Sequence, residues 1–213
     1  MLLNYDTLQK YELDINLLKS IYRKSITDNL DYFFIENWLN VLEFYYINNK
    51  ASIIKYNNEP QFFQKSIELF DKIKFYLHFD INKAESIISN YEINTMNPHK
   101  VPNNLIYNKS QYSDIHIKSN KPIIVISFPL KNMTDELVID GNHRISAKMD
   151  SGLDIPYIKF NDEDSIRTIP QYFEIFYYQF MLDYRNYSSY FPVEKRKQYI
   201  KSSSYLRNII KIE

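Results

Sequence analysis

The stretch VIDGNHRISAKMDSGLDIPYI, residues 138–158, decides the fold of the sequence around it. It contains both glycines of a 213-residue chain, Gly141 and Gly152. Globular proteins use glycine at about 7% of positions, so these two are expected where backbone geometry requires them. The pattern predicts a strand up to the first glycine, a helix over 142–151 with Gly152 at its C′ position, and a strand over 155–160.

The start of the predicted helix has the residues of an anion-binding site. Asn142 is a favourable N-cap, and the first turn of a helix presents unpaired N–H groups at the positive end of its dipole. His143 and Arg144 add cationic side chains there, which suits a phosphate group. Lys148 lies one turn after Arg144 and extends the same positive face. Gly141 lets the backbone approach the anion closely.

Asp140, at the end of the preceding strand, is open to more than one interpretation. Its carboxylate can hold Mg²⁺ or orient His143. Alternatively, Asp140 and Arg144 pair with each other, and the strand–glycine–helix junction is structural without a ligand.

The same stretch resembles the signature of the ParB/sulfiredoxin-like superfamily. That signature is a strand, a D-G-x-H-R turn that opens a helix with Ala one turn on, and then a Gly followed by I-P. The matching residues are Asp140, Gly141, His143, Arg144, Ala147, Gly152, Ile155 and Pro156. The run KPIIV, residues 121–125, resembles the strand before the signature. The resemblance covers residues 100–161 and is strongest over 121–160.

The resemblance implies a domain that binds nucleotide phosphates at the helix N-terminus, with ATP or CTP and Mg²⁺ as cofactors. The D-G-x-H-R form is closest to the free-serine kinases of the superfamily, which implies phosphoryl transfer or nucleoside triphosphate hydrolysis. Asp140 would then serve the metal or the acceptor hydroxyl as a catalytic residue together with His143. The phosphate-binding set would be Gly141, Asn142, His143, Arg144 and Lys148.

The chain also departs from each relative. It has no cysteine, so the repair chemistry of sulfiredoxin is excluded. The Arg-Arg pair of ParB is replaced by His143 and Arg144, and no helix-turn-helix signature follows. The kinases use an upstream catalytic glutamate, whereas the one acid between Pro98 and Leu130 is Asp114. Either Asp114 substitutes as the base, or the domain binds phosphate without turning it over.

Composition limits the class of protein. Lys and Arg together number 26, as do Asp and Glu, so no global positive field favours non-specific nucleic-acid binding. A hydrophobic share of 45% supports a folded core. The N-terminus lacks a signal-peptide pattern, and the most apolar run is far shorter than the roughly 20 residues of a membrane span. We expect a cytoplasmic protein, with the Asn-, Ile-, Lys- and Tyr-rich composition of a low-GC bacterium or its phage.

Helical periodicity dominates both ends of the chain. The predicted helices cover residues 6–22, 30–45, 63–77, 81–91, 173–184 and a basic last segment from Val193. Their Tyr and Phe residues are expected in the core rather than as base-stacking platforms. The run between Pro122 and Pro129 predicts a buried strand, residues 130–136 a turn, and His116 a place on the polar face of a further strand. The scattered histidines do not have the spacing of a zinc or HNH-nuclease site.

The predicted fold class is α+β, with a small mixed-sheet ParB/sulfiredoxin-like core over 98–161. A helical region over 1–97 and helices over 162–213 flank and pack on this core. The predicted function is nucleotide or phosphate binding, with Mg²⁺-dependent turnover as its extension. The alternative is a non-enzymatic, DNA-associated or phage/plasmid accessory protein that binds DNA or a protein partner through its helical regions.

Overall fold

The structure is a computed structural model that describes residues 13–48, 61–69, 72–129, 134–189 and 192–210, with the backbone of residues 2–3. The chain divides into two compact units, and both are discontinuous in sequence. Unit 1 comprises Met1–Tyr5, Asn58–Phe63 and Phe79–Thr168, and unit 2 comprises Asp6–Asn57, Gln64–His78 and Ile169–Glu213. The segment predicted as the core, 98–161, lies wholly within unit 1.

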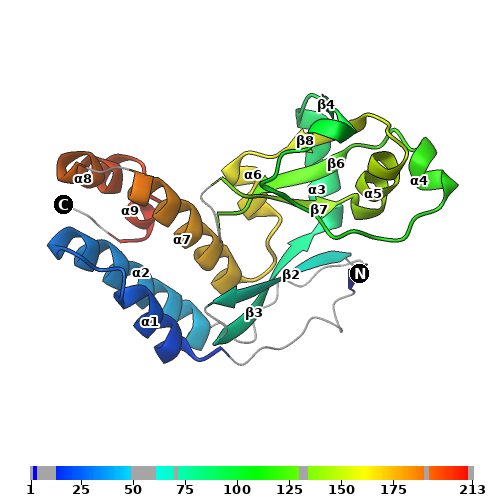
Figure 1. The fold of residues 1–213 in the computed structure, drawn as a ribbon. Coiled ribbons are helices and arrows are strands. Elements are labelled where there is room, and N and C mark those ends of the chain that lie inside the picture. Colours follow the sequence, from blue (N-terminus) through cyan, green and yellow to red (C-terminus); the bar gives the residue numbers. More distant parts are fainter. Residues whose placement is uncertain are drawn as a thin grey trace. The chain divides into compact units, whose positions relative to one another are not determined.

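Unit 1 is built on a five-stranded mixed sheet with the strand order β4-β8-β6-β7-β5 (Figure 1). The strands are β4 (Asn94–Met96), β5 (Leu105–Ile106), β6 (Ile123–Ser127), β7 (Glu136–Asp140) and β8 (Ile155–Lys159). β6 runs parallel to β8 and antiparallel to β7, while β4 pairs antiparallel with β8 and β5 pairs parallel with β7. The three strands predicted around the signature are confirmed, and so is the α+β class with a small mixed sheet.

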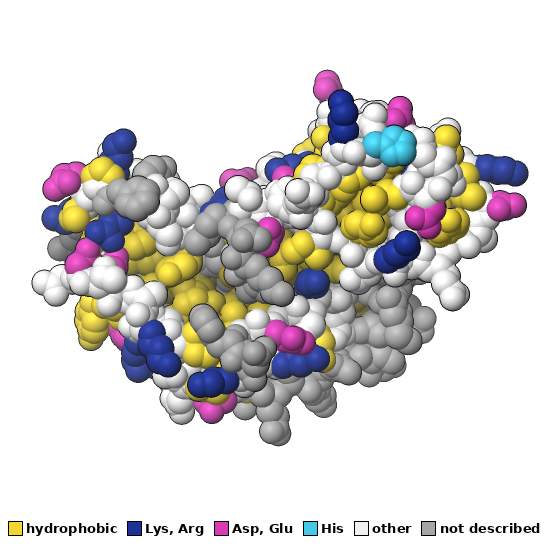
Figure 2. Space-filling model, in the orientation of Figure 1, with side chains coloured by type: hydrophobic (Ala, Val, Ile, Leu, Met, Phe, Trp, Pro, Cys, Tyr) yellow, Lys and Arg dark blue, Asp and Glu magenta, His cyan; other side chains and the backbone are white. Residues whose placement is uncertain are grey.

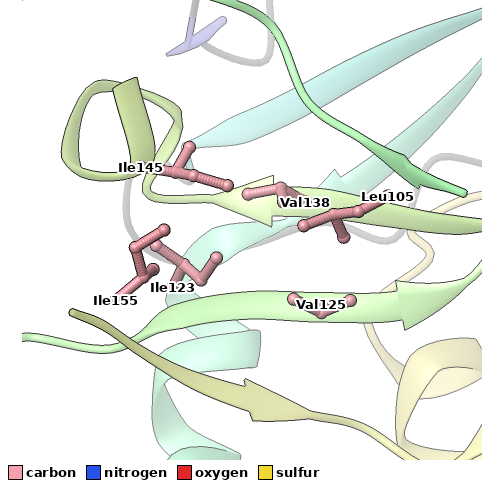
Figure 3. Packing of buried hydrophobic residues seen from close by; sticks show 6 residues of the cluster. All are labelled: Leu105, Ile123, Val125, Val138, Ile145 and Ile155. Carbon is pink, nitrogen blue, oxygen red and sulfur yellow. The ribbon is translucent and has the colours of Figure 1, made fainter. Parts of the chain in front are cut away.

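The hydrophobic core of unit 1 contains side chains of the sheet and of one helix (Figure 3). The helices of this unit are α3 (Ile81–Ile87), α4 (Asp114–Lys118), α5 (Asn142–Asp150) and α6 (Asp162–Arg167), with 3₁₀ turns η2 (Ile88–Asn90) and η3 (Pro98–Lys100). The cluster consists of Leu105, Ile123, Val125, Val138, Ile145 and Ile155. Ile145 is fully buried, and burying a side chain of this size stabilises a fold by about 1.5–3 kcal/mol. The packing of Ile145 therefore fixes the first turn of α5 against the sheet.

The end of α5 confirms the predicted role of Gly152. This glycine has a left-handed backbone with φ of 65°. The Leu153 N–H donates to the Lys148 carbonyl over 2.9 Å, and the Gly152 N–H donates to the Met149 carbonyl over 3.3 Å. These two bonds make a Schellman motif, which satisfies carbonyls that the helix would otherwise leave open.

The helices of unit 2 bury aromatic side chains against one another. They are α1 (Ile15–Arg23), α2 (Asn29–Asn48), α7 (Tyr172–Ser189), α8 (Val193–Ser202) and α9 (Leu206–Ile209). Tyr45 stacks on Phe176 with ring centroids 3.8 Å apart, and Phe34 stacks on Tyr187 at 4.2 Å. The helices predicted over 30–45 and 173–184 are confirmed by α2 and α7. Many of their rings are buried, as expected, whereas Phe33 and Phe44 of α2 are exposed.

A buried carboxylate joins four helices of unit 2. Asp183 of α7 accepts hydrogen bonds from Trp38 Nε1 at 3.1 Å and from the Tyr199 hydroxyl at 2.8 Å. The hydroxyl of Ser204 and the backbone N–H groups of Tyr205 and Leu206 donate to the same carboxylate. Because Asp183 binds N–H groups at the start of α9, the predicted single C-terminal helix is interrupted after Ser202.

The helix predicted over 63–77 is wrong, because this region forms strands β2 (Phe62–Leu69) and β3 (Ile73–Asp80). With β1 (Leu2–Leu3) they make a three-stranded sheet in the order β1-β2-β3. The spacing of the apolar residues fits a helix, but the buried residues of β3 also alternate at Ile73, Phe75, Leu77 and Phe79. A spacing of two places these side chains on one face of a strand, and the tertiary packing selects this period.

Two weaker helix predictions are shortened by the structure. The pattern over 6–22 corresponds to α1 from Ile15, and residues 6–12 lie outside the described residues. The helix predicted over 81–91 ends at Ile87 and continues as the 3₁₀ turn η2. Most of the turn predicted over 130–136, residues 130–133, also lies outside the described residues.

Positive and negative side chains are interspersed over the face of the molecule seen in Figure 2, in keeping with the formal net charge of zero. In the described part of the chain, every helix is too short or too polar to cross a membrane.

Candidate functional site

The junction between β7 and α5 depends on the lack of a side chain at Gly141. Its backbone is left-handed, with φ of 93°. A Cβ atom there would lie 2.6 Å from Ile123 Cγ2 and 2.9 Å from Arg144 Nη2, both too close for real contacts. Conformation and space therefore both require glycine at this position.

Gly141, rather than the predicted Asn142, is the N-cap residue of α5. Asn142 is the first helical residue, and its side chain serves another segment instead. Its Oδ1 accepts the Asn108 N–H at 2.7 Å. The prediction was wrong because glycine itself turns the chain into the helix, which leaves the asparagine amide available for a contact from residues distant in sequence.

The first turn of α5 has free hydrogen-bond donors. The first backbone hydrogen bond of the helix is donated by the Ile145 N–H to the Gly141 carbonyl, over 2.9 Å. The backbone N–H groups of Asn142, His143 and Arg144 precede it and have no acceptor among the described residues. These donors lie at the positive end of the helix dipole.

A cavity of about 160 Å³ lies at this helix start, and all its lining residues belong to unit 1. The β7–α5 junction contributes residues 139–143 to the lining. Asn108 and Ser110 line it from another segment, and Phe63 completes the wall. The structure thus brings the predicted residues Asp140, Gly141, Asn142 and His143 to one cavity.

Residues 108–112, which we term the strap, lie along α5. Asn108 N–H is bound by Asn142, the Ser110 N–H donates to Ser146 Oγ at 3.1 Å, and the Tyr112 hydroxyl donates to Asp150 at 3.1 Å. Two residues of extended chain advance about 6.6 Å, and four residues of helix advance about 6 Å. Every second strap residue therefore meets every fourth residue of α5. Sequence reasoning missed the strap, because its contacts join polar residues from distant positions.

Asp140 is paired with a cation of its own helix junction. Its Oδ2 lies 2.8 Å from Arg144 Nη2 and 3.9 Å from Lys121 Nζ. The same Arg144 nitrogen donates to the Pro122 carbonyl at 3.1 Å. The pairing considered from sequence is therefore present, and Arg144 links α5 to the end of β7 and to the residue before β6. Arg144 is not among the residues that line the cavity.

The residues around Asp140 do not fit a preformed Mg²⁺ site. Arg144 and Lys121 both lie at Oδ2 of Asp140, so a metal ion there would meet two cations beside its carboxylate ligand. Within the described segments, no group of three His, Asp or Glu side chains is placed to ligate one ion. Mg²⁺ sites in proteins use carboxylates together with waters and substrate phosphates, and here the single carboxylate is already neutralised.

Lys148 and Asp114 are not at the cavity. Lys148 is only 6% exposed, so it does not extend the positive surface as predicted. It faces inward because α5 packs this side against the rest of unit 1. Asp114 is the exposed first residue of α4, where a carboxylate favours the helix start. The structure therefore gives Asp114 a place in the helix rather than among the residues that line the cavity.

His116 lies beside His143, whereas the sequence pattern favoured the polar face of a strand over a place near the site. It belongs to α4 instead of the predicted strand, and its ring stacks on His143 with centroids 5.2 Å apart and an interplanar angle of 27°. His116 Nδ1 accepts the Ser113 N–H at 3.1 Å in a capping box. Ser113 followed by Asp114, an N-cap residue and an acid in the first turn, was the signal for this short helix.

A second cavity, of about 250 Å³, lies in unit 2. Its charged groups bind one another. Arg196 pairs with Asp28 at 2.6 Å and with Asp31, which also accepts the Tyr187 hydroxyl at 2.6 Å. This network accounts for the charges of that cavity, whereas the donors at the start of α5 have no partner among the described residues.

No family model, no curated protein and no solved structure matches this chain.

Proposed function

We propose that unit 1 binds a phosphate group at the start of α5. The proposal is carried by one observation: three successive backbone N–H groups without an acceptor among the described residues, on residues 142–144 beside a cavity of about 160 Å³. The D-G-x-H-R resemblance supports it independently, since four residues of this motif segment, from Asp140 to His143, line the cavity.

The donors at this site match the charge of a phosphate. Hydrogen bonds to a charged group contribute about 1.5–3 kcal/mol each, and the helix dipole adds about 0.3–1 kcal/mol. Ser110 and His143 supply side-chain polar atoms on the cavity wall. The negative charge of Asp140 is offset by Arg144 at 2.8 Å, so the carboxylate on the wall does not by itself exclude an anion.

The size of the cavity favours a phosphate group over a whole nucleotide inside it. Pockets that enclose drug-sized ligands have volumes of about 300–1,000 Å³, and this cavity has about 160 Å³. The phosphate end of ATP or CTP would enter, and the nucleoside would remain outside. Inorganic phosphate and a nucleoside triphosphate present the same chemistry to the first turn of α5.

Binding without turnover is the form of the proposal that the arrangement favours. Phosphoryl transfer would need a base and a metal ligand at the cavity. Asp140 is held by Arg144, and Asp114, an exposed residue of α4, is not among the residues that line the cavity. Mg²⁺-dependent transfer or hydrolysis is therefore the less favoured form of the proposal. If it occurs, titrations with ATP or CTP and Mg²⁺ would show it as release of phosphate.

The test is a titration of the full chain followed by amide NMR. Inorganic phosphate, pyrophosphate, ATP and CTP are added with and without Mg²⁺. We expect the largest shifts at the amides of Asn142, His143 and Arg144, and none at Ser151 or Gly152 at the other end of α5. A ligand at a hundred times its Kd should also raise the free energy of unfolding by about 2.7 kcal/mol. Shifts that bypass residues 142–144, or no shift with any of these anions, would overturn the proposal.

The same samples distinguish the accessory-protein alternative. DNA binding that leaves the amides of residues 142–144 unchanged, and that weakens steeply with salt, would assign the chain to that class instead.

A further inference from the structure

We infer that His116 is a positioning residue, which fixes the ring of His143 so that its Nε2 meets the bound phosphate group. This inference rests on the proposed function and adds a residue that neither the sequence motif nor the resemblance includes. The observation behind it is the stack of the two imidazoles, with centroids 5.2 Å apart and planes inclined by 27°.

One nitrogen of His143 is already committed. Its Nδ1 is bound to the carbonyl oxygen of Gln111 in the strap. A carbonyl only accepts hydrogen bonds, so Nδ1 carries the hydrogen. Since His143 lines the cavity, Nε2 is the ring nitrogen left for a ligand. Nε2 and a phosphate oxygen would form one hydrogen bond, and either the imidazole or the phosphate can supply its hydrogen.

His116 has the opposite arrangement. The Ser113 N–H donates to its Nδ1 at 3.1 Å, so this nitrogen is an acceptor and the ring hydrogen lies on Nε2. The flat face of the His116 ring packs against the His143 ring and limits its rotation.

Both rings are held by neighbouring backbone groups of one segment. Gln111 binds His143, and Ser113, two residues later, binds His116. The Tyr112 hydroxyl between them is tied to Asp150 of α5 at 3.1 Å. Backbone groups of this segment therefore bring the two rings together, and the stack limits the rotation that the hydrogen bond to Gln111 leaves to the His143 ring.

Two variants of His116 separate its roles. His116→Phe keeps a flat ring and loses the Nδ1 acceptor, whereas His116→Asn keeps a short acceptor for the helix start and loses the ring. We expect His116→Asn to weaken inorganic phosphate binding about three- to tenfold, the scale of one aromatic contact, and His116→Phe to weaken it less. His99→Ala, an exposed histidine of the same unit that does not line the cavity, is the matched control and should leave the affinity unchanged.

The role of His116 through His143 is tested in a double-mutant cycle. In the His143→Ala background, His116→Asn should have no further effect on phosphate affinity. Equal losses with and without His143, or an unchanged affinity in His116→Asn, would overturn the inference.

A ligand-free measurement separates this inference from the proposed function. Long-range ¹H–¹⁵N spectra of the imidazoles should give the Nδ1–H form for His143 and the Nε2–H form for His116, and His116→Asn should convert His143 to a mixture. A mixture already in the unsubstituted chain contradicts the positioning role alone. The expected forms together with no response to phosphate contradict the proposed function, and with it the ligand assigned to Nε2.

Discussion

His78 of β3 and Glu174 of α7 form a fully buried pair in unit 2, with the imidazole Nδ1 2.7 Å from one carboxylate oxygen. The second carboxylate oxygen accepts the backbone N–H of His78 at 2.8 Å. One side chain of α7 therefore holds both the backbone and the ring of a strand residue.

Replacing Glu174 tests how much this pair stabilises the fold. Glu174→Ala leaves the His78 donors buried without an acceptor, and we expect unfolding to become easier by about 3–5 kcal/mol. Glu174→Gln keeps an oxygen and a nitrogen of similar shape, so it should cost less, about 1–2 kcal/mol. Urea titration measures both. Equal losses in the two variants would show that packing, rather than hydrogen bonding, is what Glu174 provides.

The pH dependence of stability should change in the same variants. Burial raises the pKa of Glu174, and His78 acts in the opposite direction. A carboxyl whose pKa is higher in the folded than in the unfolded protein stabilises the fold in its protonated form. This stabilisation is complete below the pKa of a free glutamate, about 4.3. It is lost as the pH rises through the pKa of the carboxyl in the folded protein. Glu174→Gln has no ionisable group at this position, so its stability should not fall in this way. The difference in free energy of unfolding between the unsubstituted chain and Glu174→Gln should therefore shrink as the pH rises. A constant deficit would contradict it.

Asp183→Asn should destabilise unit 2 although it changes only one atom. The carboxylate accepts from Trp38, Tyr199 and Ser204 and from two backbone N–H groups. An amide offers one oxygen and turns an NH₂ group toward donors, which leaves at least one of them unsatisfied at about 1–3 kcal/mol each. Thermal unfolding is the measurement, with the exposed Glu194→Gln as control. A variant as stable as the control would mean that the donors find other acceptors.

The two glycines make a matched pair of substitutions. Gly152→Ala meets no atom closer than 3.9 Å, so it should cost only the left-handed backbone, about 1–2 kcal/mol. Gly141→Ala adds contacts of 2.6 and 2.9 Å with Ile123 and Arg144, which should cost about a further 1–3 kcal/mol. Chemical denaturation compares the two, and similar losses would place the strain at Gly141 in the backbone alone.

Asp140→Asn distinguishes a binding site from a metal-dependent catalytic site. Removing a negative charge from the cavity wall should strengthen phosphate binding, by about two- to tenfold for a partly buried charge. A catalytic or metal-binding carboxylate predicts the reverse, with lost Mg²⁺-dependent binding or turnover. Isothermal titration with phosphate, with and without Mg²⁺, separates the two outcomes.

Much of the fold could be predicted from local patterns in the sequence. The long helices α2 and α7 have one apolar period over many residues, and β6 is bounded by Pro122 and Pro129. α5 was predictable because each of its ends uses a glycine, the residue that most readily adopts a left-handed backbone. Such signals lie within a few residues of the structure that they determine.

The missed features depend on contacts between distant residues. The β2–β3 region has apolar residues that fit both a helix and a strand, and packing chose between them. In the sequence, Asp183 has the features of an ordinary polar helix residue, and its hydrogen bonds with Trp38 and Tyr199 depend on the tertiary fold. His116 of α4 stacks on His143 of α5, although the two residues are 27 positions apart in the sequence. The motif predicted the junction of the candidate site and, as one of two alternatives, the pairing of Arg144 with Asp140, but it did not predict which of these interpretations the fold would adopt.

The spacing match between the strap and α5 limits how this part of the protein can change in length. Removing or adding one residue within 108–112 would turn the groups on one side of the change away from the helix, so that the three ties to Asn142, Ser146 and Asp150 could not all form together. A change of two residues would instead shift the strap by about one helical turn and keep its alternation. Length variation in related chains should therefore occur here in steps of two residues.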